Sequence, residues 1–184
     1  MLSYQLLINL GLIVDKIAAN ARNMKTLIQK IHLDEQQSFA CRIYRTPDFE
    51  TNWHRHEEFE LIRITEGYGT AMIGDFIGEY KPGDLYFIAG NLPHWFKKQH
   101  HKTIGSALVL HFKKDILGQE FLQLPELKNV QQLVNKNDGL QIGARLQKEI
   151  AAMMMDVQQQ KGFYRLNCLL QCLQKIATVK LNII

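Results

Sequence analysis

Between Phe39 and Phe112 the chain alternates short runs of β-branched and aromatic residues with clusters of turn residues. Such side chains suit a pleated, half-buried surface, so this pattern is typical of an antiparallel β-protein. We expect strands in five of these runs: residues 41–44, 59–65, 70–73, 85–88 and 107–112. Many short strands at this spacing indicate a β-sandwich or a β-barrel.

Two of the intervening segments predict specific turns. Residues 73–76 hold Gly74 and Asp75 between apolar flanks, which favours a two-residue hairpin because glycine takes a positive φ without steric cost. Residues 81–84 hold Pro82 followed by Gly83. This order suits a type II turn, in which proline presets φ and glycine supplies the positive value after it.

After Gly118 the apolar residues recur at steps of three and four on a polar background. The first stripe comprises Leu140, Leu146, Ile150, Met153, Met154 and Val157, and the second comprises Phe163, Leu166, Leu169, Leu170, Leu173, Ile176 and Ala177. This period predicts two amphipathic α-helices joined by a turn at residues 160–162. The methionine run at residues 153–155 would form either an adaptable ligand or partner surface or core packing, and we favour core packing.

The composition places the chain among globular proteins of one domain with an appended element. It has 184 residues, of which 46% are hydrophobic and 22% charged, enough to close one core. The net charge is +4, but the basic residues are scattered, unlike the dense basic face of a nucleic-acid-binding domain. No run reaches the ~20 apolar residues of a membrane span, so we expect no membrane association and a cytoplasmic location.

The three cysteines, Cys41, Cys168 and Cys172, form an odd set without regular spacing. This argues against a secreted disulfide scaffold. Cys168 and Cys172 are four residues apart on the second predicted helix and share a face with apolar neighbours. We therefore expect buried thiols rather than a redox pair.

The first 23 residues form a separate N-terminal extension. Residues 2–14 are apolar enough to suggest a signal sequence, but no positive n-region precedes them, and Gln5 and Asn9 interrupt them. Met24 then opens a segment typical of a natural beginning. Our hypothesis is that residues 1–23 are an extra helix or come from an upstream start codon, which mass spectrometry of the natively expressed protein would distinguish.

The candidate chemistry is concentrated in residues 53–60. On an extended strand residues two apart project to the same face, so His54 and His56 point together, and Glu60 shares their parity. Glu58 has the same parity and is a rival carboxylate. Imidazole nitrogens with a carboxylate oxygen suit Fe, Mn, Ni, Cu or Zn. A lone His-x-His pair is weak evidence, because histidines near an acidic residue often only make hydrogen bonds.

Two spaced motifs strengthen this interpretation. His54-x-His56-x-x-x-Glu60, followed after six residues by Gly67, fits the first cupin motif in order and spacing. Residues 83–94 align with the second motif, and His94 takes the place of its histidine. The chain therefore resembles the cupin superfamily.

The chain departs from both motifs at turn positions. Asp48 stands where the first motif usually has glycine, and Ala89 and Asn91 stand where the second usually has proline and glycine. These changes affect loop geometry rather than the ligand set.

The resemblance is closer to the sensor domains of AraC-type transcription regulators. It rests on residues 53–61, 81–85, 91–95, 110–112 and 115–118, followed by the helical pair, and covers about residues 24–184. It implies a mainly β fold: a cupin double-stranded β-helix barrel, jelly-roll-like, over residues 24–118, and then a C-terminal pair of α-helices. The implied role of residues 119–184 is dimerisation and connection to a DNA-binding module.

The resemblance also implies the site. His54, His56, Glu60 and His94 are its expected ligands for a divalent transition metal, Fe, Mn, Ni or Zn, and for a small polar effector such as a sugar. His111 alternates with apolar neighbours on a strand, and we expect a satisfied structural histidine there.

Two further features near the site are expected to lie outside it. His100 and His101 stand in a lysine-rich loop and should be solvated, and Trp95 has the parity opposite to that of His94, which favours the outer packing surface.

Two functions fit these features. In the first, the chain is the effector-sensing, dimerising half of an AraC-type regulator and is not an enzyme. No helix-turn-helix lies within its residues, so DNA would be bound only through a domain absent from this chain. The chain ends on the largely apolar residues 180–184, and we expect further sequence after them.

The alternative is a stand-alone metal-dependent cupin enzyme, a dioxygenase or isomerase, that uses open metal positions for substrate or oxygen. An interaction-only domain is the weakest interpretation, because it gives the four polar side chains no reason to converge. The amphipathic helical pair favours the regulator, since a catalytic cupin needs no dimer seam.

Overall fold

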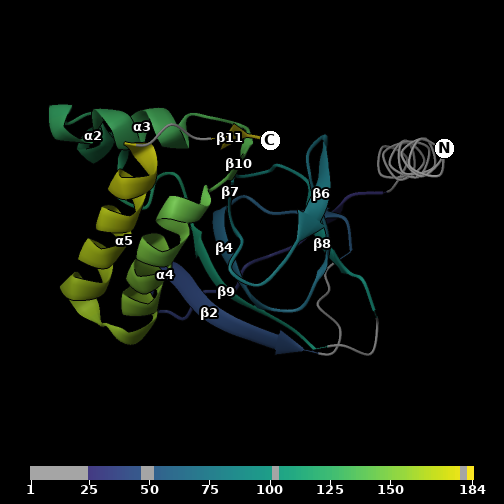
Figure 1. The fold of residues 1–184 in the computed structure, drawn as a ribbon. Coiled ribbons are helices and arrows are strands. Elements are labelled where there is room, and N and C mark those ends of the chain that lie inside the picture. Colours follow the sequence, from purple (N-terminus) through teal and green to yellow (C-terminus); the bar gives the residue numbers. More distant parts are fainter. Residues whose placement is uncertain (1–24, 47–51, 101–103, 179–181) are drawn as a thin grey trace.

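The computed structural model describes residues 25–46, 52–100, 104–178 and 182–184, arranged as helices on one side of two β-sheets (Figure 1). The predictions for residues 1–23, Asp48 and His101 lie outside the described residues. No helix in the described part of the chain has the length and apolar character needed to cross a membrane.

One sheet has five strands in the order β1-β3-β8-β5-β6. The strands are β1 (Leu27–Ile28), β3 (His54–Arg55), β8 (His94–Lys98), β5 (Gly69–Ile73) and β6 (Phe76–Tyr80). β1 pairs with β3 in parallel, and the other pairs are antiparallel.

The other sheet has six strands in the order β11-β10-β7-β4-β9-β2, all paired antiparallel. The strands are β11 (Asn182–Ile183), β10 (Gly139–Gln141), β7 (Leu85–Ile88), β4 (Phe59–Glu66), β9 (Gly105–Phe112) and β2 (Phe39–Thr46). The strands β4 and β9 are central to this sheet and carry part of the candidate site.

Helices cover the face of the six-stranded sheet that points away from the five-stranded sheet (Figure 1). They are α2 (Gln119–Leu122), the 3-10 helix η1 (Pro125–Leu127), α3 (Lys128–Val134), α4 (Ala144–Gln159) and α5 (Gly162–Ala177). The guanidinium of Arg165 on α5 donates to the Phe39 carbonyl at 3.1 Å and lies 4.1 Å from the centre of the Phe39 ring. This contact holds α5 against β2.

Two hydrophobic cores lie on the two faces of the six-stranded sheet, because successive residues of a strand point to opposite sides. The core on the helix side includes Phe59, Leu61, Leu110, Phe112, Ile150, Met154, Leu169 and Ile176. The core between the sheets includes Ile62, Ile64, Ile73, Tyr86, Ile88, Phe96 and Val109. Burying each of these larger side chains contributes roughly 1.5–3 kcal/mol.

The local predictions are confirmed. All five predicted strand runs lie within β2, β4, β5, β7 and β9. Ile73 pairs with Phe76 across the predicted hairpin, with Gly74 at φ 56°. Gly83 has φ 99°, as a type II turn requires.

The helical pair is confirmed as well, with α4 and α5 separated only by residues 160–161, but the place of Leu140 on the first helical stripe was wrong, because Leu140 lies on β10 and pairs with β7. Most residues of both apolar stripes pack within the chain against the six-stranded sheet, but Phe163 at the start of α5 is 74% exposed. Met154 is fully buried and its two methionine neighbours pack against the same core, as predicted. The three cysteines are free thiols, with Cys172 buried and the other two half-buried.

The fold is mainly β with helices mostly near the C-terminus, as predicted. Residues 119–184 are not purely helical, because β10 pairs with β7 and extends the six-stranded sheet. Closure of the two sheets into a double-stranded β-helix barrel stays a prediction.

Candidate functional site

His54 and His94 lie directly opposite each other on β3 and β8 of the five-stranded sheet, with ring centres 4.3 Å apart. The Nδ1 of His54 is 2.9 Å from the Asn52 carbonyl, and the Nδ1 of His94 is 2.8 Å from the Leu92 carbonyl. A carbonyl oxygen only accepts hydrogen bonds, so both Nδ1 atoms carry a proton. In the neutral form of such a ring the lone pair is therefore on Nε2.

Glu60 and His111 form a matching pair on the other sheet. They are opposite each other on β4 and β9, and the His111 Nε2 is 2.9 Å from the Glu60 Oε2. The His111 Nδ1 is buried and has no hydrogen-bond partner among the described residues. The site thus spans the boundary between the two sheets.

His56 lies between these pairs, in the short link from β3 to β4. Its Nδ1 donates to the Glu58 carbonyl at 3.0 Å, and its Nε2 is 3.0 Å from the Glu60 Oε2. The Glu58 carboxylate is 3.9 Å from the Nδ1 of His56, on the side of the ring turned away from the cluster. Glu60, not its rival Glu58, is therefore the carboxylate that faces the histidines.

One oxygen of the Glu60 carboxylate lies close to three imidazole rings. The Oε2 of Glu60 lies 3.0 Å from the Nε2 of His56, 2.9 Å from that of His111 and 3.5 Å from that of His94. All five side chains of the cluster are at most 6% exposed. A buried carboxylate without positive partners would cost several kcal/mol, so the imidazoles or a bound cation must compensate it.

Burial and the partners of each group set the charges in this cluster. Burial raises the pKa of Glu60, but His94, His111 and His56 outweigh it and hold that pKa well below its usual value. Burial lowers the pKa of His56, but the hydrogen bond and charge of Glu60 outweigh it and raise that pKa. Burial and the charge of His94 lower the pKa of His54 from 6.5 to about 4, so this ring is neutral at neutral pH.

The residues fit a metal ion. Two sets of ligand atoms each lie within 4.8 Å of one another: one set is His54, His56 and His94, and the other is His56, Glu60 and His111. Backbone carbonyls orient three of the imidazoles through Nδ1, as is usual for metal-binding histidines. The His94 Nε2 is buried without a hydrogen-bond partner among the described residues. Imidazole nitrogens with one carboxylate suit Fe, Mn, Ni or Zn.

The sequence identified four of the five residues in this cluster. His54, His56, Glu60 and His94 are brought together as predicted. His111 was expected to be a satisfied structural histidine, but it lies in the cluster with its Nδ1 unsatisfied. The alternation of side chains along β4 and β9 could have identified His111, but only with the strand register known. That register places His111 opposite Glu60, so that both side chains point to the same face of the sheet.

Trp95 and His100 both lie outside the cluster, as expected. Trp95 packs on the outer face with Trp53 and Met72, as its parity predicted. His100 is exposed.

The loop before β8 is adapted to hold the histidines together. The Asn91 N–H donates to the His56 carbonyl at 2.7 Å, and Asn91 has φ 63°. Asparagine tolerates this left-handed conformation better than most residues, which explains how it replaces the usual glycine of the motif. Gly90 is required, because a Cβ there would lie 2.3 Å from the Glu57 carbonyl oxygen.

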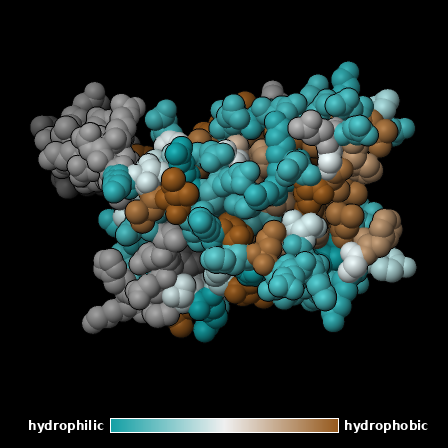
Figure 2. All heavy atoms as spheres, turned by 180° about the vertical axis from the view of Figure 1, so that it is seen from behind, coloured by the Kyte–Doolittle hydropathy of each residue, from teal (hydrophilic) through white to brown (hydrophobic). Residues whose placement is uncertain are grey.

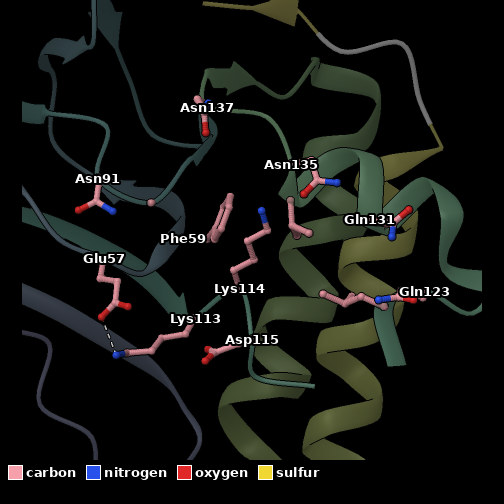
Figure 3. A pocket seen from close by; sticks show the side chains of 13 residues that line it. Glu57, Phe59, Asn91, Lys113, Lys114, Asp115, Gln123, Gln131, Asn135 and Asn137 are labelled. Atoms are coloured by element: carbon pink, nitrogen blue, oxygen red, sulfur yellow. Dashed lines mark hydrogen bonds and ion pairs between the residues drawn. The ribbon is translucent and has the colours of Figure 1, made fainter. Parts of the chain in front are cut away.

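A pocket of about 530 Å³ lies on the other side of β4 (Figure 3). Its walls are Phe59, the loop before β8, the segment after β9, and α2 and α3. Lys113 and Glu57 form an ion pair of 2.6 Å at its rim. Five carboxamide side chains line it: Asn91, Gln123, Gln131, Asn135 and Asn137. The pocket thus lies between the six-stranded sheet and the helices. Phe59 lines it, whereas the next residue, Glu60, points to the opposite face of the sheet and into the histidine cluster.

Among the comparisons with known proteins, one family model matches most of the chain. The family model described as "AraC-like ligand binding domain" matches residues 36–170. No curated protein matches the chain.

Similar solved structures include a cupin 2 conserved barrel domain protein from Rhodopseudomonas palustris, with 21% identity over 45% of this chain and 57% of that one, at a TM-score of 0.37. Another is ToxT from Vibrio cholerae O395, bound to (E)-4-(8-methylnaphthalen-1-yl)but-3-enoic acid. It has 11% identity over 74% of this chain and 54% of that one, at a TM-score of 0.48. Rru_A2000 from Rhodospirillum rubrum, a cupin-2 domain, has 20% identity over 45% and 55%, at 0.38. The chain spans little more than half the length of these structures, and such TM-scores add no argument to the family match.

Proposed function

This chain belongs to the AraC-like ligand binding domain family, and we propose on that basis that it is the effector-sensing domain of an AraC-type transcription regulator. Its effector is a small polar molecule, with sugars among the candidates, that binds at His54, His56, Glu60 and His94. The chain senses rather than catalyses, and DNA is bound only through a domain absent from this chain.

The observation that carries this proposal is the position of the cluster. Two of its residues come from the five-stranded sheet and two from the six-stranded sheet, with His56 in the link between them. A ligand that bonds both pairs would change how the two sheets sit against each other. Such a change needs a ligand that binds one arrangement more tightly than the other.

The structure supports a route from the cluster to the helices. Glu60 points to the cluster, and the preceding residue, Phe59, stacks on Phe112 with ring centres 5.5 Å apart in the helix-side core. The Asn91 N–H bonds the His56 carbonyl, and Leu92 packs against both cores. A displacement at the cluster would therefore reach α2 and α3 through packed side chains.

Dimerisation is part of the same proposal. Most residues of the apolar stripes of α4 and α5 are buried within the chain, so a dimer contact must use the apolar residues that remain exposed. Phe163 and Tyr164 at the start of α5 are 74% and 72% exposed. Figure 2 shows hydrophobic residues gathered on the helical side of one face. These features support a homodimer formed through the C-terminal helices.

A divalent transition metal would be held by His54, His56, Glu60 and His94. When bound, such an ion offers open coordination positions and polarises an oxygen of a bound molecule. Because the Nδ1 of His54, His56 and His94 donates to a backbone carbonyl, each of these imidazoles would bind an ion through Nε2. The same donor set favours the second candidate, a metal-dependent cupin enzyme of the dioxygenase or isomerase class.

Ligand-induced stabilisation tests the effector proposal. We would screen neutral monosaccharides, sugar acids and dicarboxylates by thermal unfolding, with His54→Ala, His94→Ala and the exposed His32→Ala as a control. A ligand at 100 times its Kd stabilises by about 2.7 kcal/mol, which raises Tm by roughly 5–10 °C in a chain of this size. The shift should persist in His32→Ala and disappear in both cluster variants.

The same variants in the intact regulator provide the decisive readout. If His54→Ala and His94→Ala both leave the transcriptional response to the effector unchanged, the cluster is not the sensing site. Turnover of a ligand by the wild type, lost in both variants, would instead favour the enzyme.

A further inference from the structure

The two sets of ligand atoms in the cluster overlap in one residue. His54, His56 and His94 form an all-imidazole set, and His56, Glu60 and His111 form a set of two imidazoles and one carboxylate. The first set joins the five-stranded sheet to the link before β4, and the second joins that link to the six-stranded sheet.

The shared histidine makes the two sets mutually exclusive. The Nδ1 of His56 donates its proton to the Glu58 carbonyl at 3.0 Å, so only Nε2 can bind an ion. A single lone pair binds one ion at a time. The cluster therefore offers two alternative positions for one ion, rather than a site for two ions.

The two positions differ in the metals they suit. Three imidazoles suit Zn²⁺ and Cu²⁺, whereas two imidazoles with a carboxylate form the set typical of Fe²⁺ and suit the oxygen-preferring Mn²⁺. Glu60 is held toward the second position, because its Oε2 is 2.9 Å from His111 and 3.5 Å from His94.

We propose that the cluster selects between two overlapping metal positions: Zn²⁺ or Cu²⁺ binds at His54, His56 and His94, and Mn²⁺ or Fe²⁺ binds at His56, Glu60 and His111. This inference rests on the metal binding included in the proposed function. It divides that set of four ligands into two alternative sets of three and adds His111 as a ligand. The competing role for His111 is only to donate a hydrogen bond that orients Glu60.

The second position is expected to be the weaker one. When the His111 Nε2 binds an ion, its Nδ1 carries the proton, and no described residue accepts that proton. Metal-binding histidines usually donate this proton to an acceptor, which strengthens the ligand.

Metal titrations of the chelator-washed full chain test the proposal. We would measure Zn²⁺ and Mn²⁺ affinities calorimetrically for the wild type, His94→Gln, His111→Gln and the control His32→Gln. Glutamine can still donate to the Glu60 carboxylate, so the His111 variant keeps that hydrogen bond. Losing a ligand should cost at least about tenfold in affinity.

The expected result is a crossed pattern. His94→Gln should weaken Zn²⁺ at least about tenfold and Mn²⁺ less than about threefold, and His111→Gln should do the reverse. Equal losses for both ions in each variant, or unchanged Mn²⁺ affinity in His111→Gln, would overturn the proposal. A wild type that binds neither ion would overturn it together with the metal part of the proposed function, and would leave effector sensing intact.

A measurement on the wild type keeps the test independent of how the variants fold. Electron paramagnetic resonance of the Cu²⁺-loaded and Mn²⁺-loaded chain counts the nitrogens bound to each ion. Three nitrogens on Cu²⁺ and two on Mn²⁺ would support the two positions, and equal counts would overturn them.

Discussion

On its helix-facing side the six-stranded sheet presents Phe59 and Phe112, whereas Glu60 and His111, one residue away on the same two strands, face the other sheet. The apolar pair stacks at 5.5 Å and joins a continuous core. The polar pair is just as buried, but its Glu60 oxygen is shared by three imidazoles. The two strands therefore carry apolar packing residues on one face and the polar cluster on the other. A substitution on the packed face should affect stability differently from a substitution of the adjacent residue on the polar face.

The largest expected effect is on the packed face. Phe112→Ala should lower the free energy of unfolding by about 3–5 kcal/mol, because it leaves a cavity in the helix-side core. Chemical denaturation measures this loss. The surface variant Ile43→Ala, at a position 53% exposed on β2, is the control and should change stability by less than about 0.5 kcal/mol. Equal losses in the two variants would contradict the packing described here.

On the polar face the effect should depend on pH. The pKa of His54 is about 4 in the folded chain and 6.5 as its ordinary value. Between these values the unfolded chain binds a proton that the folded chain does not, so this residue destabilises the fold as pH falls from 6.5 to 4. The total is about 3 kcal/mol, at 1.36 kcal/mol per unit.

Unfolding of the metal-free wild type and His54→Gln across this pH range isolates the contribution of His54. The wild type should lose more stability than the variant as the pH falls, even though the raised pKa of His56 acts in the opposite direction in both proteins. Parallel pH profiles would show that His54 is not held neutral by burial.

A smaller effect is expected from the carboxylate at the centre of the cluster. Glu60→Gln removes the negative charge that compensates the imidazoles and should cost about 1–3 kcal/mol, because it leaves hydrogen bonds unmade in a buried place. Glu57→Gln, on the exposed ion pair with Lys113, is the matched control and should cost less than about 1 kcal/mol. A Glu60 variant as stable as the Glu57 control would argue against a tightly coupled cluster.

The smallest effect concerns the loop that touches both faces. At φ 63°, Asn91→Ala should be less stable than Asn91→Gly by about 1 kcal/mol, because an alanine Cβ strains the left-handed backbone. Thermal unfolding of the two variants measures the difference. Equal stability would show that the positive φ is not maintained in solution.

The sequence predicted those parts of the fold that local chemistry determines. The glycines at 74 and 83 sit in the turns they predicted, and the runs of β-branched residues became strands. The helical stripes were found as well, but a stripe does not reveal what covers it. In the structure the six-stranded sheet covers most of both stripes, and Phe163 is exposed.

The features that the sequence did not predict depend on contacts between residues far apart in the chain. β10 has three residues and is defined by its pairing with β7, and α3 is only seven residues long. His111 joins the site through a register that pairs it with Glu60, 51 residues away. The choice of Glu60 over Glu58 likewise depends on the bend between β3 and β4, which parity alone could not decide.

The most direct test is the metal content of the chain purified without chelator, measured by elemental analysis for the wild type and His56→Gln. His56 belongs to both sets of ligand atoms, so its loss should disable every position in the cluster. About one Fe, Mn, Ni or Zn ion per wild-type chain, absent from His56→Gln, is the predicted result. A wild type without stoichiometric metal, or a variant that retains it, would contradict a metal centre at the boundary of the two sheets.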